Sequence, residues 1–590
     1  MTAPKIFRSP FADVFVHERS IFSHLFSSSS VPGNVGAYPA THPAFIDAKT
    51  GTTLTREHTK KLALSLGFGL RNHPIYPTTR GDKILMFSHN SFAYPIALFG
   101  SVAAGLRFSP AKDILDARQL ATQYTENQAH LIFSSELGIP VVLEMFKELG
   151  VPAQEARQRI IVLPNSVEWA GGPATPYCPE AKGLLTMEDL LQLGTLKAEE
   201  AFDGEQSNET VYVSYTSGTT SHSKGVAISH RHLTSVIDIT KPAFPQLDHN
   251  YDKIIGLLPF YHIYGAIMVL HLPLVFGIPV VIMSHFDPVD YCANIEKYHI
   301  TVSMIIPPIM VVLSQHPAVD QFDMTSIDIV YCGAAPLGAP LQKQVQDRLQ
   351  SKNKVKKTVD ILQGYGLTET SPTTHLLERK DGNRKVGSVG VLLANLEARL
   401  VLDSEGTLDA EVGEPGEFWV RGPSIFKRYI NNETANKNAF TEDGWFKTGD
   451  ILTRDEEGYY YVVERRNEMI VYKGFEVAPA DLESVLLTHP GVGDAAVVGV
   501  ESVKEGTELP RAYIVHKNPE VLRTEEDRQA FALEVQTWIT TQVESPKHLR
   551  GGVVVIDKIP KIPSGKIMRR QLGHKAKLEI AAEGSTQASV

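Results

Sequence analysis

From about residue 52 onward, short apolar runs of strand length alternate with helix-like segments. ILMFS at 84–88, HLIFSS at 130–135 and RIIVLP at 159–164 are strand-like, and PIALFGSVAAG at 95–105 is helix-like. This alternation is typical of parallel sheets, because parallel strands need long crossover connections that helices usually supply. The sequence therefore predicts an α/β fold whose large N-terminal domain consists of parallel-type sheets with helices.

The pattern changes after about residue 385. Short β-type runs with turn signals, such as EARLVLDSEG and GEFWVRG, predict a small antiparallel or β-barrel-like subdomain at about 385–465. Beyond a charged strip, a compact pattern of helices and short strands begins. We therefore predict a large domain over residues 1–465, which includes the β-rich subdomain, and a small mobile α+β domain over 468–590. The tail, from about residue 576, is predicted to be disordered.

Composition narrows the classes of function. The chain has 590 residues and is 43% hydrophobic, which gives room for several cores. It has 57 Lys and Arg against 67 Asp and Glu, and the net charge of −10 provides no general attraction for nucleic acid. Cys178, Cys292 and Cys332 are widely spaced. They indicate neither a disulfide framework nor a zinc site, and they fit a reducing compartment.

The N-terminal MTAPKIFRSPFADVF contains no apolar signal core, and the C-terminal STQASV is not an SKL-type peroxisomal signal. We expect a cytoplasmic location, with a peroxisomal one as the alternative, and a monomer or homodimer. The segment from Ile254 to Phe286 lacks Asp, Glu, Lys and Arg and is long enough to span a membrane. Glycines and prolines interrupt it, so we predict a buried strand, loop, helix and strand, and no transmembrane segment.

Small and hydroxyl residues gather in the stretch from Tyr215 to Lys224, which reads YTSGTTSHSK and lies between two β runs, VYVSY and GVAIS. A Walker A loop would pass from its lysine directly into a helix, and this stretch does not match it. Hydroxyls and glycine allow O–H and backbone N–H groups to converge on phosphate oxygens. The stretch therefore predicts a polyphosphate-binding loop, with a plain polar turn as the alternative.

Four further runs identify the kind of polyphosphate enzyme. They are QGYGLTET at 363–370, GWFKTGD at 444–450, YVVERRNEMIVYKGFEVAP at 461–479 and KIPSGKIMRR at 561–570. Together with LPFYHIYG and CGAAPL, they resemble, in order and over nearly the whole chain, the motifs of the AMP-forming adenylating enzymes, and most closely the 4-coumarate–CoA ligases and related acyl-CoA synthetases. The resemblance implies an ATP-dependent carboxylic acid–CoA ligase. A carboxylate attacks ATP to give acyl-AMP and pyrophosphate, CoA then displaces AMP, and the small domain rotates between the steps.

The resemblance assigns the nucleotide site residue by residue, with ATP, Mg²⁺ and CoA as the cofactors. The residues expected to bind the β,γ-phosphates are Thr216, Ser217, Gly218, Thr219, Thr220 and Lys224. Adenine and the α-phosphate are expected to contact Gln363, Gly364, Tyr365 and Thr368. The ribose is expected to bind Asp450 and Arg465, and Mg²⁺ is expected to bind Glu369 and Thr219. Lys566 is expected to stabilise charge during adenylation, because it lies in a Ser-Gly turn that can project into a site. Lys566, His262 and Glu369 form the expected catalytic set.

The acyl, CoA and hinge positions show departures from the family pattern. The expected acyl pocket consists of His262, Tyr264, Met268, Tyr331, Gly333 and Ala334, the CoA site of Lys473, Gly474 and His285, and the hinge of Asn467. Met268 and Tyr331 occupy positions that are Ser and Lys in coumarate ligases, which favours an apolar aryl or medium-chain acid over hydroxycinnamates. Val471 replaces a lysine, His285 replaces a CoA-contacting lysine, and Asn467 stands where Lys or Asp is usual.

Three other functions remain compatible with parts of this pattern. A luciferase-like oxygenase would act on its own acyl-AMP, and the loss of lysine at 471 disfavours it. An adenylating enzyme could deliver the acyl group to an acceptor other than CoA. A non-catalytic nucleotide-binding protein is disfavoured because Glu369, Asp450, Arg465 and Lys566 are all present.

Overall fold

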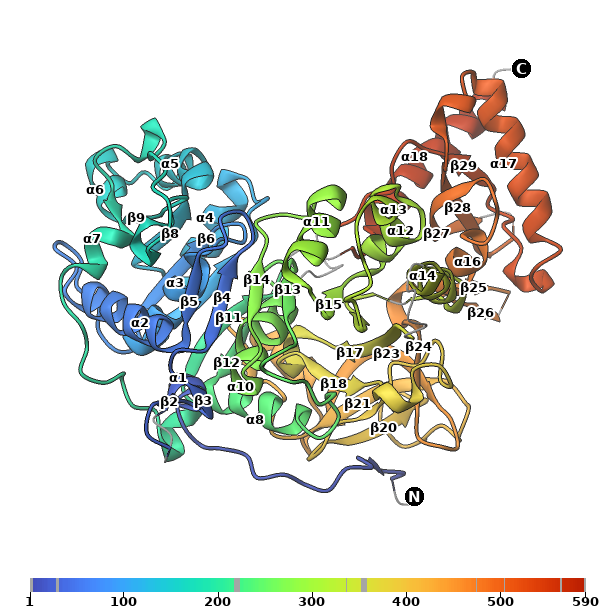
Figure 1. Cartoon of the computed structure of the whole chain (residues 1–590). Coiled ribbons are helices and arrows are strands. Elements are labelled where there is room, and N and C mark those ends of the chain that lie inside the picture. The colour runs from blue at the N-terminus through green and yellow to red at the C-terminus, as the bar shows by residue number, and fades with distance from the viewer. Residues whose placement is uncertain are drawn as a thin grey trace.

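A nine-stranded and an eight-stranded sheet form the body of the large domain in the computed structural model (Figure 1). The structure describes residues 4–27, 31–216, 223–335, 337–351, 358–473, 475–502, 505–562 and 565–587, and the side chains of Asn467 and of residues beyond 580 are not among the described parts. The predicted α/β fold is confirmed. One contiguous apolar core joins both sheets, and a second, smaller one lies beneath α4 and α5 (Ala117–Asn127 and Ile139–Glu148).

The eight-stranded sheet has the order β10-β9-β8-β6-β7-β11-β12-β22, and its first six strands run parallel. Its strands are β6 Lys83–Phe87, β7 Arg107–Ala111, β8 Leu131–Ser135, β9 Ile160–Leu163, β10 Leu185–Thr186, β11 Thr210–Tyr215, β12 Gly225–Ser229 and β22 Arg428–Tyr429. Its other helices are α2 Arg56–Arg71, α3 Tyr94–Ala103, α6 Ala153–Gln158 and α7 Met187–Leu191. Every residue of β8 and β9 is buried, which is why these strands read as continuous apolar runs.

The nine-stranded sheet has the order β19-β18-β17-β16-β15-β13-β14-β4-β5 and is parallel from β17 to β4. Its strands are β4 Pro43–Asp47, β5 Thr53–Thr55, β13 Ile254–Gly256, β14 Val280–Ile282, β15 Val302–Ile305, β16 Ile329–Cys332, β17 Asp360–Gly366, β18 Thr373–Leu376 and β19 Val391–Leu392. Its helices include α8 His230–Thr240, α10 Leu272–Phe276, α11 Pro288–Tyr298, α12 Pro307–Gln315 and α14 Ala339–Ser351. Shorter elements are α1 Ile21–Phe26, β2 Asn34–Val35, β3 Tyr38–Pro39, α9 Ile263–Gly265, α13 Ala318–Gln321 and α15 Glu433–Ala439.

Most of the uncharged segment from Ile254 to Phe286 is buried in this second sheet, and Ser284 and His285 near its end are exposed. It forms β13, a π-helical turn at Ala266–His271, α10 and β14, as the glycines and prolines predict. Among the helices of the described residues, none is both long and apolar enough to cross a membrane.

The β-rich subdomain is a five-stranded antiparallel sheet with the order β1-β20-β21-β23-β24. Its strands are β1 Phe7–Arg8, β20 Glu397–Val401, β21 Gly416–Arg421, β23 Phe446–Arg454 and β24 Tyr460–Arg465. Strand β24 also bridges to Gly390 through Tyr460, which joins this sheet to the β18–β19 edge of the nine-stranded sheet. The site residues of β17, β23 and β24 are brought together by this junction.

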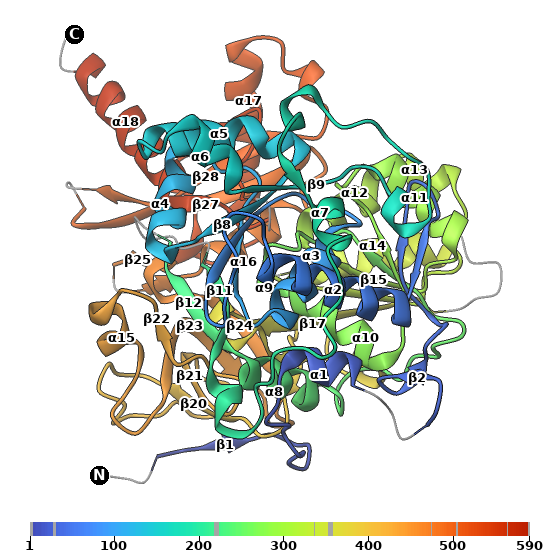
Figure 2. The same ribbon diagram turned by 90° about the vertical axis from the view of Figure 1, so that its left-hand side faces the viewer.

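In Figure 2 the small domain lies above the five-stranded sheet, and the Ala480 N–H of the small domain donates to Glu464 of β24 at 3.1 Å. This domain comprises β25 Ile470–Tyr472, β26 Phe475–Val477, α16 Pro479–Leu486, β27 Val492–Ser502, β28 Thr507–His516, α17 Glu525–Ile539, β29 Val553–Val555 and α18 Arg569–Gln587. It has cores of its own. The prediction of a disordered tail from about 576 is wrong, because α18 continues through Gln587. Leu572 and Ala576 are buried against β27 and β28, and Glu579 binds Arg511 and Tyr513.

Candidate active site

A cavity of about 1120 Å³ lies where the small domain meets the large one. Strands β16, β17, β23 and β24 contribute their ends to it, and the small domain contributes Lys566. Most of the sequence-predicted residues line it: Thr216, Lys224, His262, Tyr264, Met268, Tyr331, Gly333, Ala334, Gln363, Gly364, Tyr365, Thr368, Glu369, Asp450, Arg465 and Lys566. Residues separated by up to 350 positions are thus gathered around one space.

Asp450 is the centre of the expected ribose corner. It pairs with Arg465 across β23 and β24, and the Arg465 Nε lies 3.1 Å from its Oδ1. The Tyr365 hydroxyl donates to its Oδ2 at 2.6 Å. Burial and the neighbouring carboxylate hold the pKa of the Tyr365 phenol well above its usual value, and the same carboxylate raises the pKa of Arg465. The Tyr365 hydroxyl and the Arg465 guanidinium, which both belong to the cavity, therefore hold the Asp450 carboxyl group in place.

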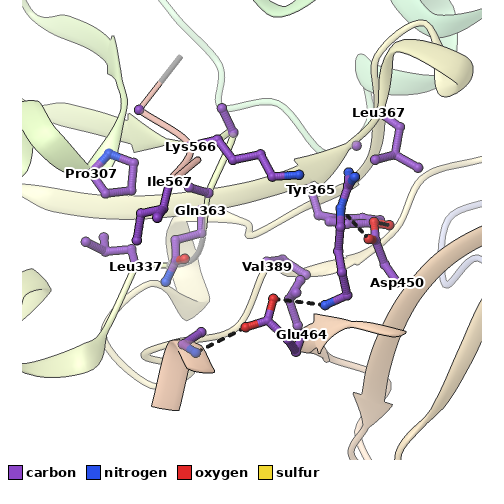
Figure 3. Close-up of a pocket in the computed structure, with 18 of the residues that line it drawn as sticks. Pro307, Leu337, Gln363, Tyr365, Leu367, Val389, Asp450, Glu464, Lys566 and Ile567 are labelled. Carbon is purple, nitrogen blue, oxygen red and sulfur yellow. Dashed lines mark hydrogen bonds and ion pairs between the residues drawn. The ribbon is translucent and has the colours of Figure 1, made fainter. Parts of the chain in front are cut away.

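Lys566 approaches this corner from the small domain. Figure 3 shows its side chain extending toward Tyr365 and Asp450. It follows Gly565, whose φ of +86° is accessible to glycine at little cost, and the Lys561–Ile567 bridge closes the turn. Burial and the nearby Arg465 lower the pKa of the Lys566 ammonium. The predicted projection of this lysine into the site is therefore present in the structure.

Glu369 lies in the one-turn helix Thr368–Thr370 at the expected metal position. Burial raises the pKa of its carboxyl, and a hydrogen bond from the Tyr429 hydroxyl to Oε1, at 2.8 Å, opposes that rise. The Lys224 Nζ lies 4.9 Å from the centroid of the Tyr429 ring. A carboxylate beside a phosphate-loop lysine fits Mg²⁺, which is usually held by one or two carboxylates and by substrate phosphates.

Sequence reasoning missed Tyr429, since no motif contains it. Strand β22 places it by pairing Tyr429 with Val226 of β12, the strand that leaves the predicted phosphate loop. Its only sequence signal is an aromatic residue in the short run KRYI, more than two hundred positions from that loop.

Met268 and Tyr331, at the expected acyl end of the cavity, both have hydrogen-bond partners. Met268 and Tyr331 are each 3% exposed. The Thr373 hydroxyl donates to the Met268 sulfur at 3.6 Å, and the Tyr331 hydroxyl donates to the Leu377 carbonyl at 3.4 Å. A β-carbon at Gly333 would lie 3.3 Å from the Tyr264 ring, so a larger residue there would narrow the pocket.

His262 borders the acyl end from the turn before α9. Its Nδ1 accepts the Tyr264 backbone N–H at 3.2 Å. Burial, with a contribution from Lys112, lowers the pKa of His262 to about 4. At neutral pH His262 is therefore an uncharged imidazole and offers a hydrogen bond without a formal charge.

Lys473 and His285, two of the predicted CoA residues, do not line the cavity. Lys473 is half exposed and pairs with Glu505 at 2.8 Å, and His285 is exposed beside Ser284. Asn467 belongs to the one-turn helix Arg466–Glu468. Five predicted site residues lie outside the described residues: Ser217, Gly218, Thr219, Thr220 and Gly474. The roles of these CoA, hinge and loop residues stay predictions.

Comparisons with known proteins agree with this geometry. Residues 33–430 match the AMP-binding enzyme family, and residues 481–566 match the AMP-binding enzyme C-terminal domain. The chain belongs to the AMP-binding enzyme family. The two matches fall on either side of the predicted boundary between the large and small domains.

Curated relatives extend along the chain to different degrees. The chain is 31% identical to 4-coumarate-CoA ligase 1 of Narcissus pseudonarcissus, with 98% of this chain and 97% of the relative covered. Peroxisomal OPC-8:0-CoA ligase 1 of Arabidopsis thaliana is 31% identical, with 90% of each covered. Probable 4-coumarate--CoA ligase 1 of Dictyostelium discoideum is 38% identical, but the alignment spans only 62% of this chain and 63% of the relative.

Solved structures share the fold. An anthranilate CoA ligase, AuaEII, in complex with anthranoyl-AMP has a TM-score of 0.80 at 20% identity and covers 96% of this chain and 99% of its own. ATP-bound MatB from Rhodopseudomonas palustris has a TM-score of 0.77 at 23% identity, with 95% and 99% covered. At these identities the likeness establishes the fold of this AMP-binding enzyme.

Proposed function

We propose that the chain is an ATP-dependent carboxylic acid–CoA ligase. In the first half-reaction a carboxylate oxygen bonds to the α-phosphorus of ATP and pyrophosphate leaves. In the second, the CoA thiol, losing its proton, bonds to the acyl carbon and AMP leaves. One observation carries the proposal: Lys566 of the small domain and the Asp450–Tyr365–Arg465 corner of the large domain share one cavity with an apolar pocket.

The side chains of the cavity account for the adenylation step. Asp450 would accept the ribose hydroxyls, which fixes the nucleotide beside Tyr365. Lys566 would then neutralise the charge that develops as two anions, the carboxylate and the α-phosphate, approach each other. Glu369 would hold Mg²⁺, which when bound neutralises phosphate charge. Because His262 is neutral, it would border the acyl group without offering the incoming carboxylate a second positive charge besides that of Lys566.

The acyl pocket indicates the substrate class. Thr373 donates to Met268 and Tyr331 donates to Leu377, so these two hydroxyl donors are already engaged. A ring stack of Tyr331 on Phe244, with centroids 5.6 Å apart, supports the pocket from behind. We propose an aryl or medium-chain acid with an uncharged tail as the substrate. The cytoplasmic location and the monomeric or homodimeric state stay predictions.

ATP–pyrophosphate exchange across a panel of acids tests the substrate. Phenylacetic, cinnamic and medium-chain fatty acids are expected to exceed 4-coumarate and all amino acids. Each buried methylene contributes about 0.8 kcal/mol, so the rate should change about fourfold per carbon along the fatty acid series. A preference for 4-coumarate or for an amino acid would contradict this pocket assignment.

The acyl acceptor is tested with the same panel. Thioester detected with CoA supports the ligase. Pyrophosphate exchange without thioester formation would instead favour delivery of the acyl group to an acceptor other than CoA. That alternative is compatible with Val471 in place of a lysine and with the position of Lys473 outside the cavity. Light or oxygen consumption with acyl-AMP would favour the luciferase-like alternative.

Tyr429→Phe is expected to weaken metal use. The substitution removes the hydroxyl that orients Glu369, and hydrogen bonds to charged groups contribute about 1.5–3 kcal/mol. We expect the Mg²⁺ concentration for half-maximal exchange to rise on the order of tenfold or more, and Mn²⁺ binding in the presence of ATP to weaken in parallel. Tyr461→Phe is the matched control, because the Tyr461 hydroxyl donates to Asp455 away from the cavity. An unchanged Mg²⁺ dependence in Tyr429→Phe would contradict this role.

A further inference from the structure

Four charged side chains surround the Lys566 ammonium. Arg465 of β24 and Asp450 of β23 face it from the large domain, Arg569 faces it from α18, and Glu468 faces it from the one-turn helix after β24. Glu468 is the carboxylate that the structure pairs with Lys566, at 3.5 Å between Oε1 and Nζ. Two guanidinium groups and two carboxyl groups therefore lie around the Lys566 ammonium.

The two carboxylate oxygens of Glu468 have different surroundings. Oε2 is bound by the Arg569 guanidinium at 2.7 Å. Oε1 is buried and has no hydrogen-bond partner among the described residues, and its ion pair is the one with Lys566. The Glu468 side chain is only 8% exposed, so water cannot readily satisfy this oxygen. The Glu468 oxygen that has no hydrogen-bond partner among the described residues is thus the one that faces the Lys566 ammonium.

Glu468 is connected through Arg569 to other residues of the small domain. Both carboxylate oxygens of Glu483 bind the Arg569 guanidinium, at 2.9 and 2.8 Å, and the Val497 N–H donates to Glu483 at 2.8 Å. The connection therefore runs from the backbone of β27 through Glu483 and Arg569 to Glu468. All four charged residues, Glu468, Glu483, Lys566 and Arg569, follow the predicted hinge at 467, so a rotation there would carry them together.

We propose that Glu468 is a positioning residue that holds the Lys566 ammonium, in its protonated form, toward the nucleotide corner for adenylation. The proposal rests on the function proposed above. Asp450 also attracts Lys566, but it belongs to the large domain and is committed to Tyr365 and Arg465. Glu468 is therefore the anion that accompanies the lysine.

The electrostatics of the cluster give a specific expectation. Burial, Arg465 and Arg569 lower the pKa of Lys566, and Glu468 and Asp450 oppose them. Removing the charge of Glu468 takes away one of the two carboxylates that raise the pKa of Lys566, so this pKa falls further. Because the protonated lysine is the form that stabilises the reaction, activity should be lost at a lower pH.

The test is Glu468→Gln, measured by ATP–pyrophosphate exchange from neutral to alkaline pH. An opposite charge within 4–6 Å shifts a pKa by about 1–3 units, so the alkaline limb of kcat/KM is expected to move down by about one unit or more. Thioester formation from supplied acyl-AMP and CoA should keep its rate. Glu468→Asp should restore part of the limb. Glu579→Gln, which breaks an ion pair with Arg511 elsewhere in the small domain, should leave it unchanged.

A second readout does not depend on activity. The rate at which an amine-reactive acylating reagent labels Lys566, followed by peptide mass spectrometry against pH, reports the pKa of this lysine directly. The pH of half-maximal labelling should fall in Glu468→Gln and not in Glu579→Gln. An unmoved limb together with an unmoved labelling curve overturns the proposal while the ligase function stands. Absence of exchange with every acid in the unmodified protein would instead overturn the proposed function.

Discussion

Lys566→Ala is expected to lose acyl-AMP formation by a factor on the order of 10²–10³, because one preorganised charge-stabilising group is removed. Nucleotide binding should change little, since Asp450, Tyr365 and Arg465 stay in place. In the thioester-forming arrangement the same lysine is expected to lie away from the reacting atoms. The variant supplied with synthetic acyl-AMP and CoA should therefore make thioester at a near-normal rate.

The two half-reactions separate this role from a structural one. Pyrophosphate exchange measures the first step, and thioester formation from acyl-AMP measures the second. Lys575→Ala is the matched control, because Lys575 also follows the turn but pairs with Glu579 on α18 outside the cavity. Normal adenylation by Lys566→Ala, or an equal loss in both steps, would show that the assigned role is wrong.

Local pattern was sufficient to predict the elements that carry the site. Strands β6, β8 and β9 read as apolar runs because both faces of a parallel sheet are buried. The motif residues Gln363 to Glu369, Asp450 and Arg465 were likewise expected to form one site, because the resemblance supplied the long-range arrangement that periodicity cannot. The cavity confirms that they lie together.

Long-range pairing explains what local pattern did not predict. Tyr429 reaches Glu369 only because β22 pairs with β12. From the sequence, the tail from about residue 576 is predicted to be disordered, because its polar, alanine-rich sequence has weak periodicity. It is helical because Leu572 and Ala576 pack on β27 and β28 and Glu579 binds Arg511. In each case a tertiary contact overrides a weak local signal.

Charged residues near the domain boundary were the hardest to interpret. The sequence shows a charged strip near Glu464–Arg466, but Glu464 is buried, the Glu468 side chain is only 8% exposed, and Arg569 binds both of them. Burial of like-charged carboxylates is tolerable only when cations reach them, and the cation that reaches both, Arg569, comes from α18, about a hundred positions away. The Glu468 role could therefore be inferred only after the fold was in view.

Asp450→Ala is expected to have the second large effect, on nucleotide binding. The carboxylate would accept the ribose hydroxyls, and hydrogen bonds to charged groups contribute about 1.5–3 kcal/mol. The Kd for AMP and the KM for ATP should therefore rise roughly 10- to 150-fold. Tyr365 also loses its acceptor and Arg465 its partner, but the Arg465 side chain is 37% exposed and can be rehydrated. The cost to folding should accordingly be smaller than the cost to binding.

Two measurements separate the loss of AMP binding from any loss of folding stability. They are titration calorimetry with AMP and the stabilisation by AMP during thermal unfolding, because a ligand stabilises the folded protein only to the extent that it binds. Asp455→Ala is the matched control. Asp455 lies just after the same strand, pairs with Lys385 at 2.7 Å and does not line the cavity. It should lower thermal stability without changing the Kd for AMP. Asp450→Asn, which keeps the shape but removes the charge, should fall between the unmodified protein and Asp450→Ala. If AMP stabilises Asp450→Ala as strongly as the unmodified protein, Asp450 does not hold the ribose, and the orientation of the nucleotide in the cavity must be reassigned.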